Sequence, residues 1–241
     1  MIVMPAMSRV QAASWNGVMD LHRRLDHGWT LVGGQLVHLH CAERGYVPPR
    51  PTDDVDTVID VRADVGMLQT FTGVLVGLGF TPDGISAEGT QHRWVRGDAV
   101  LDVLLPDGVG ERAASRTGAT GSPTIPTPGG TQALRRSVAV AVTVEGREGH
   151  VRRPDIVGAL VMKAAAHTAV GDAARGRHRF DFATLAAMIA ARDFREVDLN
   201  KKDRKRLGVM LAATRGDRAV MLGLAHAEES LDRLERAVKL R

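Results

Sequence analysis

The sequence contains a single cysteine, Cys41, among 241 residues, so no disulfide can form within one chain. Proteins of oxidising compartments commonly use disulfides, whereas cytosolic proteins keep their thiols reduced. The shortage of cysteine therefore favours a reducing compartment, and we expect a cytoplasmic protein. Cys41 has no second cysteine or spaced histidine cluster near it in the sequence, which argues against zinc and favours a buried apolar thiol.

Long apolar runs are also lacking. Gly, Lys or His interrupts the longest ones before they reach the roughly 20 residues of a membrane span, so we expect no transmembrane helix. Residues 1–10 carry one arginine and do not resemble a signal peptide. With 44% apolar and 25% charged residues, the composition is typical of a soluble globular protein. A net charge of +4 and a pI near 9.7 mildly favour polyanionic partners such as nucleotides or RNA.

The two parts of the chain differ in pattern. Up to about residue 150, short runs of alternating or helical periodicity are separated by Gly and Pro, which predicts strands mixed with helices. From Pro154 onward the periodicity is helical, and Pro154 itself suits a first helical turn. We therefore expect an α+β fold, with a mixed-sheet domain at residues 1–150 and an all-helical domain at residues 151–241.

The same patterns predict individual elements. In the first domain we expect helices at 15–25, 35–43 and after a cap at Asp64, and strands at 29–32, 54–61, 91–95, 99–105 and 137–144. Residues 96–98 are expected to join two strands as a hairpin, and residues 116–132, rich in Gly, Pro, Ser and Thr, to form a loop. In the second domain we expect helices at 155–170, 180–192, 200–214 and 218–240, with glycines such as Gly171 between them.

Three aspartates are candidates for a metal site. Side chains alternate along a strand, so Asp54 and Asp56 share one face at a spacing of roughly 6–7 Å. Asp102 lies in the middle of the apolar strand 99–105, where an unpaired charge among apolar neighbours is unfavourable and therefore suggests a function. Carboxylate oxygens suit Mg²⁺, and two ions roughly 3.5–4 Å apart can activate a hydroxyl and hold a triphosphate. We expect these residues to hold two ions of Mg²⁺ or Mn²⁺.

Gly33 and Gly34 are candidates for a phosphate-binding turn. They lie between strand 29–32 and helix 35–43, where free backbone N–H groups and the positive end of the helix dipole can hold a phosphate. Glycine has no Cβ, so a phosphate can approach closely. The sequence therefore assigns the triphosphate to the glycines and the metal ions to the carboxylates.

Each of these motifs also has a purely structural explanation. A Gly-Gly pair is more often only a tight turn, and an Asp-x-Asp pair is more often a solvated strand end. Their conjunction in this order and on these elements favours a real site. Lys163 stands out in an apolar helix, but it could equally reach solvent from the helix edge. Asp181 could equally be a charge that stabilises a helix N-terminus.

The segments Leu31-Val32-Gly33-Gly34 and Thr52-Asp53-Asp54-Val55-Asp56 resemble the signature of the DNA polymerase β-like nucleotidyltransferase superfamily. Val161-Met162-Lys163-Ala164 and Arg177-His178-Arg179-Phe180-Asp181 resemble its AbiEii/MenT branch, the nucleotidyltransferase toxins of bacterial toxin–antitoxin systems. The resemblance covers roughly residues 29–185. The nineteen residues between Gly34 and Asp54, 35–53, exceed the family's usual spacing, and loop 44–51 accommodates them.

The resemblance implies a nucleotidyltransferase fold, with a helical domain that closes over the nucleotide. It implies a magnesium-dependent enzyme that moves a nucleoside monophosphate from an NTP to a hydroxyl acceptor and releases pyrophosphate. Lys163 is expected to contact the nucleotide phosphates, and Asp181 to help organise the site. Asp102 is the expected general base, because a metal-binding carboxylate beside the attacking hydroxyl can take its proton.

The acceptor stays open at this point. The toxin resemblance implies tRNA as the acceptor and a cognate antitoxin as a partner, without a role for a membrane. The basic run at 200–206 could contact RNA, although a solvated helix face explains such a run more often. The alternatives are a small-molecule antibiotic nucleotidyltransferase and a non-catalytic nucleotide-binding protein of the same fold. His38 and His40 face different sides of a helix and make no metal pair.

Overall fold

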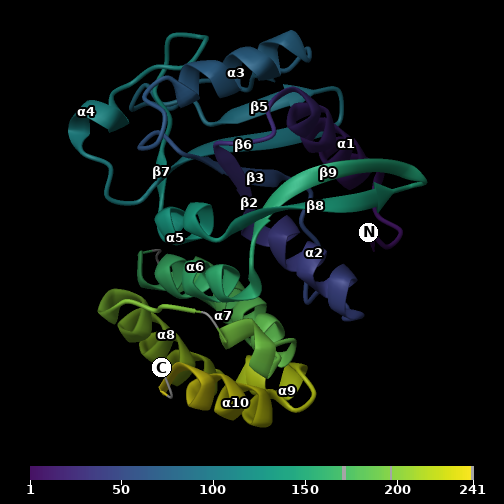
Figure 1. Ribbon diagram of the computed structural model, residues 1–241, viewed down its shortest axis with the longest axis vertical. Helices are drawn as coiled ribbons and strands as arrows, with labels where there is room; N and C mark the ends of the chain where they lie inside the picture. The colour runs from purple at the N-terminus through teal and green to yellow at the C-terminus, as the bar shows by residue number, and fades with distance from the viewer. Residues whose placement is uncertain (170–171, 196, 240–241) are drawn as a thin grey trace.

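The computed structural model describes residues 1–169, 172–195 and 197–239. The sheets and the first helices lie in the upper part of the molecule, and a group of helices forms the C-terminal part below them (Figure 1). The expected α+β fold, a mixed sheet followed by a helical region, is confirmed. The domain boundary after residue 150 stays a prediction. Among the described residues, no helix combines the length and the apolar character needed to span a membrane.

The larger sheet has six strands and forms the framework of the N-terminal part. Its order is β2-β3-β6-β5-β4, with β7 beside β6. The strands are β2 (Trp29–Val32), β3 (Val55–Ile59), β4 (Thr81–Pro82), β5 (Arg93–Arg96), β6 (Ala99–Pro106) and β7 (Pro126–Thr127). β3 and β6 run parallel, whereas β2-β3, β6-β5 and β5-β4 are antiparallel, so the sheet is mixed. Helix α3 (Met67–Gly77), β4 and β5 lie between the two strands of the parallel pair in the chain.

A smaller sheet, in the order β1-β8-β9, lies beside the first. It consists of β1 (Ile2–Val3), β8 (Ser137–Val144) and β9 (Arg147–Pro154), and the hairpin turns at Glu145 and Gly146, which both have positive φ. The strand at 137–144 is confirmed, but β9 was not expected. Its first half is polar and exposed, so it has no alternating apolar pattern to mark it. Helix α1 (Arg9–Arg24) packs against both β6 and β9.

Helices form the rest of the molecule. α2 (Gly33–Arg44), α4 (Glu111–Ala114) and α5 (Gly130–Arg135) belong to the N-terminal part. The C-terminal part contains α6 (Ile156–Ala169), α7 (Asp172–Ala187), the 3₁₀ helix η1 (Ala191–Phe194), α8 (Lys201–Arg215), α9 (Arg218–Gly223) and α10 (Ala227–Lys239). β7 and the start of α5 fall within the loop expected at 116–132, so that expectation is wrong for residues 126–127 and 130–132.

Several predicted boundaries are wrong for identifiable reasons. The helix expected from residue 180 begins at Asp172, and the single helix expected at 218–240 is two helices, separated where His226 has a φ of 55°. Asp64 is not the cap of α3, because its carboxylate accepts from the backbone N–H of Gly66 at 2.7 Å, one residue before the helix. The expected residues Val170, Gly171 and Leu240 lie outside the described part of the chain.

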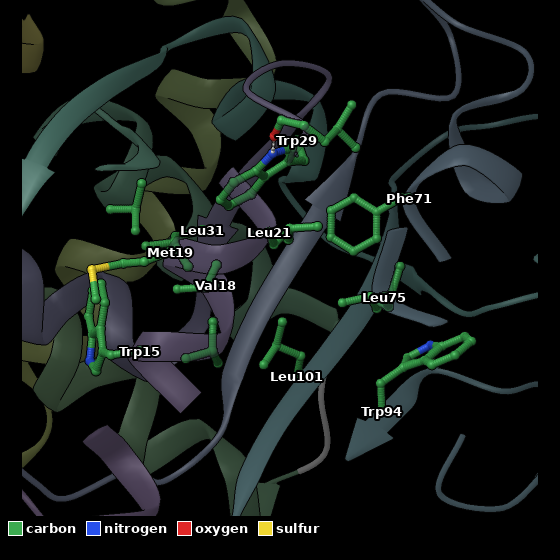
Figure 2. Packing of buried hydrophobic residues seen from close by; sticks show 14 of the residues in the cluster. Trp15, Val18, Met19, Leu21, Trp29, Leu31, Phe71, Leu75, Trp94 and Leu101 are labelled. Carbon is green, nitrogen blue, oxygen red and sulfur yellow. Dashed lines mark hydrogen bonds between the residues drawn. The ribbon is translucent and has the colours of Figure 1, made fainter. Parts of the chain in front are cut away.

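The main hydrophobic core lies between α1, α3 and the larger sheet. Figure 2 shows Trp15, Val18 and Leu21 of α1 on one side and Phe71 and Leu75 of α3 on the other, with Leu101 of β6 between them. Trp29 packs edge to face on Phe71, and its Nε1 donates to the carbonyl of Leu25 at 2.7 Å. Burial of such a side chain contributes about 1.5–3 kcal/mol. This core holds the central strands in place.

A second core fills the helical part, and α2 contributes to it. Leu36, Val37 and Cys41 of α2 pack with apolar residues of α6, α7, α8 and α10. The N-terminal end of α2 therefore adjoins the sheet, because it directly follows β2, while its apolar side packs against the C-terminal helices. This places the first residues of α2 between the two parts of the molecule.

Candidate active site

A row of residues crosses the centre of the larger sheet. The strand register pairs Val32 with Asp56, Asp56 with Asp102, and Asp102 with Arg93. Residues paired across neighbouring strands project to the same face, so Asp56, Asp102 and Arg93 lie side by side. Asp54 lies immediately before β3, and the ligand atoms of the three aspartates all lie within 4.8 Å of one another. The structure thus brings together the three carboxylates that were expected to hold metal ions.

Gly33 and Gly34 lie against these carboxylates. They are the first two residues of α2, not a separate turn before it, which corrects the sequence-based boundary. Gly33 has a φ of +68°, and a Cβ there would overlap the Asp56 carboxylate. A Cβ on Gly34 would lie 2.7 Å from Thr52 Cγ2. The lack of side chains therefore lets the first turn of α2, whose N–H groups have no intrahelical acceptor, approach the carboxylates closely.

Buried amides position the segment that carries Asp54. Gln11 of α1 and Gln35 of α2 both donate to the carbonyl of Thr52, at 2.7 and 2.6 Å. The indole of Trp15 donates to Gln35 at 3.0 Å, which orients that amide. The Thr52 hydroxyl then donates to one oxygen of Asp54 at 3.0 Å. The position of Asp54 therefore depends on two helices as well as on β3.

Arg93 of β5 contacts two of the three carboxylates. Its Nε and Nη2 donate to the two oxygens of Asp102 at 2.9 and 2.8 Å, and Nη2 also donates to Asp54 at 3.1 Å. A two-pronged pair of this kind is among the stronger hydrogen-bonded ion pairs in proteins. One guanidinium thus offsets part of the negative charge of the cluster.

The repulsion within the cluster changes the pKa of Asp56. Burial, together with the charges of Asp54 and Asp102, raises the pKa of Asp56 to about 7. Three carboxylates this close repel one another unless cations accompany them. A hard divalent cation with oxygen ligands would relieve this repulsion, so the residues present fit Mg²⁺ or Mn²⁺.

Lys163 and Asp181 form a buried ion pair between α6 and α7. Lys163 Nζ donates to Asp181 at 2.7 Å, and their side chains are only 3% and 1% exposed. Arg50, in the loop before β3, donates to the same carboxylate at 3.2 and 3.0 Å. Burial alone would raise the pKa of Asp181, but the charges of Lys163 and Arg50 outweigh it and lower that pKa. Lys163 therefore does not reach solvent at a helix edge, and Asp181 lies inside α7 and not at its N-terminus.

The carboxylates and Lys163 line one cleft with a volume of about 440 Å³. This volume lies in the range of small-molecule sites, roughly 300–1,000 Å³. The predicted site residues on its walls are Gly33, Gly34, Asp54, Asp56, Asp102 and Lys163. Asp181 is not one of the residues that line the cleft, but it contacts Lys163, which does line it. Arg177 and His178 of α7 also line the cleft, and burial lowers the pKa of His178 to about 4, so this imidazole is neutral at pH 7.

Arg93 and Arg50 were not among the residues expected at the site. A signal for Arg93 exists: in an antiparallel hairpin that turns at Gly97 and Asp98, Arg96 pairs with Ala99, and the same register places Arg93 opposite Asp102. For Arg50 no periodic signal exists, because it lies in a proline-rich loop whose path depends on tertiary contacts.

Other sequence features have structural explanations. His38 hydrogen-bonds the carbonyl of Arg50 at 2.8 Å, and His40 is buried beside Glu43. Burial raises the pKa of the Cys41 thiol to about 12, as expected for an apolar buried cysteine. In the basic run, Arg206 pairs with Asp107 at 3.1 Å and so connects α8 to the sheet part.

No protein-family model and no curated protein matches the chain. Among solved structures, the chain is similar to the solution structure of the antibiotic-resistance factor ANT(2'')-Ia, with 16% sequence identity and a TM-score of 0.47. The match covers 89% of this chain and 96% of that chain.

Proposed function

We propose that the protein transfers a nucleoside monophosphate from an NTP to a hydroxyl acceptor and releases pyrophosphate. The observation that carries the proposal is the convergence of Asp54, Asp56 and Asp102 within 4.8 Å, beside the glycine start of α2. Carboxylates for divalent cations and helix N–H groups for phosphates are the two requirements of phosphoryl transfer from a nucleotide. Lys163 adds a cation to the lining of the same cleft.

The residues of the cleft divide the chemical work. Asp54, Asp56 and Asp102 would hold Mg²⁺ or Mn²⁺, which when bound offsets the charge of the triphosphate and lowers the pKa of the attacking hydroxyl. The N–H groups at Gly33 and Gly34, together with Lys163, bind phosphate oxygens and stabilise the charge that develops on the departing pyrophosphate.

Proton transfer and positioning complete the proposal. Asp102 is the proposed general base, which takes the proton of the acceptor hydroxyl as the new P–O bond forms. Asp181 positions Lys163, since its carboxylate holds the ammonium at 2.7 Å. Arg50 donates to the same carboxylate at 3.2 and 3.0 Å and so supports the same arrangement.

Two acceptor classes follow from the sequence resemblance. The first is tRNA, as for a toxin that is held inactive by a cognate antitoxin in the cytoplasm. The second is a small molecule with hydroxyl groups, such as an aminoglycoside antibiotic. A gene for an antitoxin next to the gene of this protein would support the first class.

The test is transfer of label from α-³²P-labelled NTPs, one nucleotide at a time, with Mg²⁺ and either total tRNA or an aminoglycoside panel. We expect the wild type to label one acceptor class, and Asp56→Asn to reduce the rate by about 100-fold or more, because transition-state charge loses its support. Asp60→Asn is the matched control. Asp60 directly follows β3, and its carboxylate accepts from the backbone N–H groups of Arg62 and Ala63, so transfer should be retained.

The outcomes separate the proposal from its rival. Label on neither acceptor class with any NTP rejects nucleotidyl transfer to both classes. If equilibrium dialysis then shows NTP binding that survives Asp56→Asn, the protein is a non-catalytic nucleotide-binding protein of this fold. Equal rates for the wild type and Asp56→Asn would remove the carboxylate cluster from the mechanism.

A further inference from the structure

Arg93 is a cation that already contacts two of the three proposed metal ligands. Together with the Thr52 hydroxyl, it engages all four carboxylate oxygens of Asp54 and Asp102. We propose that Arg93 is the built-in counter-ion of the metal site: it holds Asp54 and Asp102 in the metal-free protein and competes with divalent cations for them, so that it sets the metal affinity. This inference rests on the proposed function and extends it to a residue outside the expected site.

The backbone fixes Arg93 in this position. Arg93 is the direct partner of Asp102 across the β5-β6 hairpin, and the hairpin closes tightly at Gly97, which has a φ of +57°. The guanidinium therefore meets Asp102 without any rearrangement of the main chain. Because β6 is also paired with β3, which Asp54 precedes, the same guanidinium is close enough to contact both carboxylates.

Competition follows from the chemistry of the arginine side chain. A guanidinium does not lose its proton in proteins, so Arg93 cannot become neutral when a divalent cation approaches. Like charges repel, and the metal needs the oxygens that now accept hydrogen bonds from Arg93. Arg93 must therefore move away. Its side chain is 38% exposed, so it can turn toward solvent without unfolding of the sheet.

A purely structural role for Arg93 makes the opposite prediction. If Arg93 only held the carboxylates together, its removal would let Asp54 and Asp102 repel each other and move apart. The metal site would then be less well formed, and divalent cations would bind more weakly. The sign of the change in metal affinity therefore distinguishes the two roles.

The experiment is a calorimetric titration of chelator-treated protein with Mn²⁺ alone, in the absence of nucleotide. We expect Arg93→Gln to bind Mn²⁺ about tenfold more tightly than the wild type, which corresponds to about 1.4 kcal/mol. Arg96→Gln is the matched control: it lies on the same strand and removes the same charge, but Arg96 pairs with Asp20 at 3.1 Å and lies over the ring of Phe80. Its Mn²⁺ affinity should stay within about twofold of the wild type, since Arg96 lies three residues along β5, roughly 10 Å away, and projects to the opposite face of the sheet, where salt weakens its effect on the carboxylates.

Thermal unfolding gives a second readout. In chelator, Arg93→Gln should melt below the wild type because Asp54 and Asp102 lose their counter-ion. In saturating Mn²⁺ the difference should shrink or disappear, because the metal replaces the lost charge. A difference in melting temperature that is unchanged by Mn²⁺ contradicts the proposal.

Other results would also overturn it. Arg93→Gln that is folded by circular dichroism but binds Mn²⁺ equally or more weakly than the wild type refutes the competition, and so does the absence of Mn²⁺ binding to both. If Arg93→Gln does not fold, Arg93→Lys takes its place. Lysine keeps the charge but has no planar fork, so Mn²⁺ binding should become about two- to fivefold tighter, and an unchanged affinity counts against the proposal. If Arg93→Gln binds Mn²⁺ more tightly than the wild type but the wild type transfers no nucleotide, only the proposed function is rejected.

Discussion

Replacement of Asp181 is expected to destabilise the protein more than replacement of its partner Lys163. Asp181→Asn leaves two cations, Lys163 and Arg50, facing a neutral amide, and the lysine side chain is only 3% exposed. Lys163→Met leaves Asp181 paired with Arg50 at 3.2 and 3.0 Å, and the thioether suits the apolar surroundings of α6. Loss of Asp181 thus leaves a buried lysine without a counter-ion, whereas loss of Lys163 leaves an aspartate that is still paired.

The magnitudes follow from this difference. Removal of one partner of a buried pair costs about 3–5 kcal/mol when the other charge stays buried and uncompensated. We expect this full effect, about 3 kcal/mol, for Asp181→Asn. For Lys163→Met we expect about 1 kcal/mol, since the remaining hydrogen-bonded charge pair with Arg50 is retained. The double variant should be more stable than Asp181→Asn alone, because it no longer buries an unpaired lysine.

The assay is urea unfolding of the four proteins at pH 7, followed by circular dichroism and without metal or nucleotide. Equal slopes against urea would show that the variants unfold to the same extent, so that the midpoints report stability. A cost for Lys163→Met that equals or exceeds that of Asp181→Asn would refute the reasoning. Strict additivity in the double variant would refute it as well, because contacting residues of one network are expected to couple.

Three further predictions concern the glycine turn, a histidine and the core. Gly33→Ala should weaken Mn²⁺ binding, measured by calorimetry, by about tenfold or more, because the added Cβ displaces the Asp56 carboxylate. Gly45→Ala is the control: Gly45 has a φ of +73° and open space around it, so the variant has the backbone strain alone and its Mn²⁺ affinity should be unchanged. His178 has a folded pKa of about 4 against about 6.5 unfolded, so its contribution to stability is complete above pH 6.5 and is lost as the pH falls toward 4. Since His178 is partly exposed, His178→Gln should remove about 1 kcal/mol of the loss between pH 7 and pH 5 in urea unfolding, and an identical loss in both proteins would contradict this. Phe71→Ala should cost about 3–5 kcal/mol in the same assay, because it empties a fully buried site beside Trp29, and a cost below about 1 kcal/mol would contradict the packing described for that core.

Much of the candidate site could be predicted because its residues depend on local patterns. Asp54 and Asp56 lie two apart at the start of a strand, and Asp102 lies in a strongly apolar one, so alternation alone places them on defined faces. Arg93 could have been found from the hairpin register, since a turn at Gly97 and Asp98 sets every pair on β5 and β6.

The remainder depends on contacts that no local pattern contains. Arg50 meets Asp181 across 131 residues of sequence, and this contact requires the path of a loop and the packing of α7 to be known. Strand β9 is similarly hidden, because the exposed half of the strand carries polar residues. The division of residues 218–240 into two helices depends on a single residue, His226, whose backbone conformation the helical periodicity does not reveal.

Helix α2 has a consequence for how the two parts of the molecule act together. Its first turn lies at the carboxylates, its apolar side packs in the helical core, and at its far end Arg44 forms a two-pronged pair with Asp193 at 2.7 and 2.8 Å. Because Gln35 in the first turn of α2 is also bonded to Thr52 and Trp15, this helix connects the glycine turn to both the sheet part and the helical part. A truncated chain that ends near residue 150 would therefore expose Leu36 and Val37, which pack with the C-terminal helices, and we expect it to be less stable than the full chain.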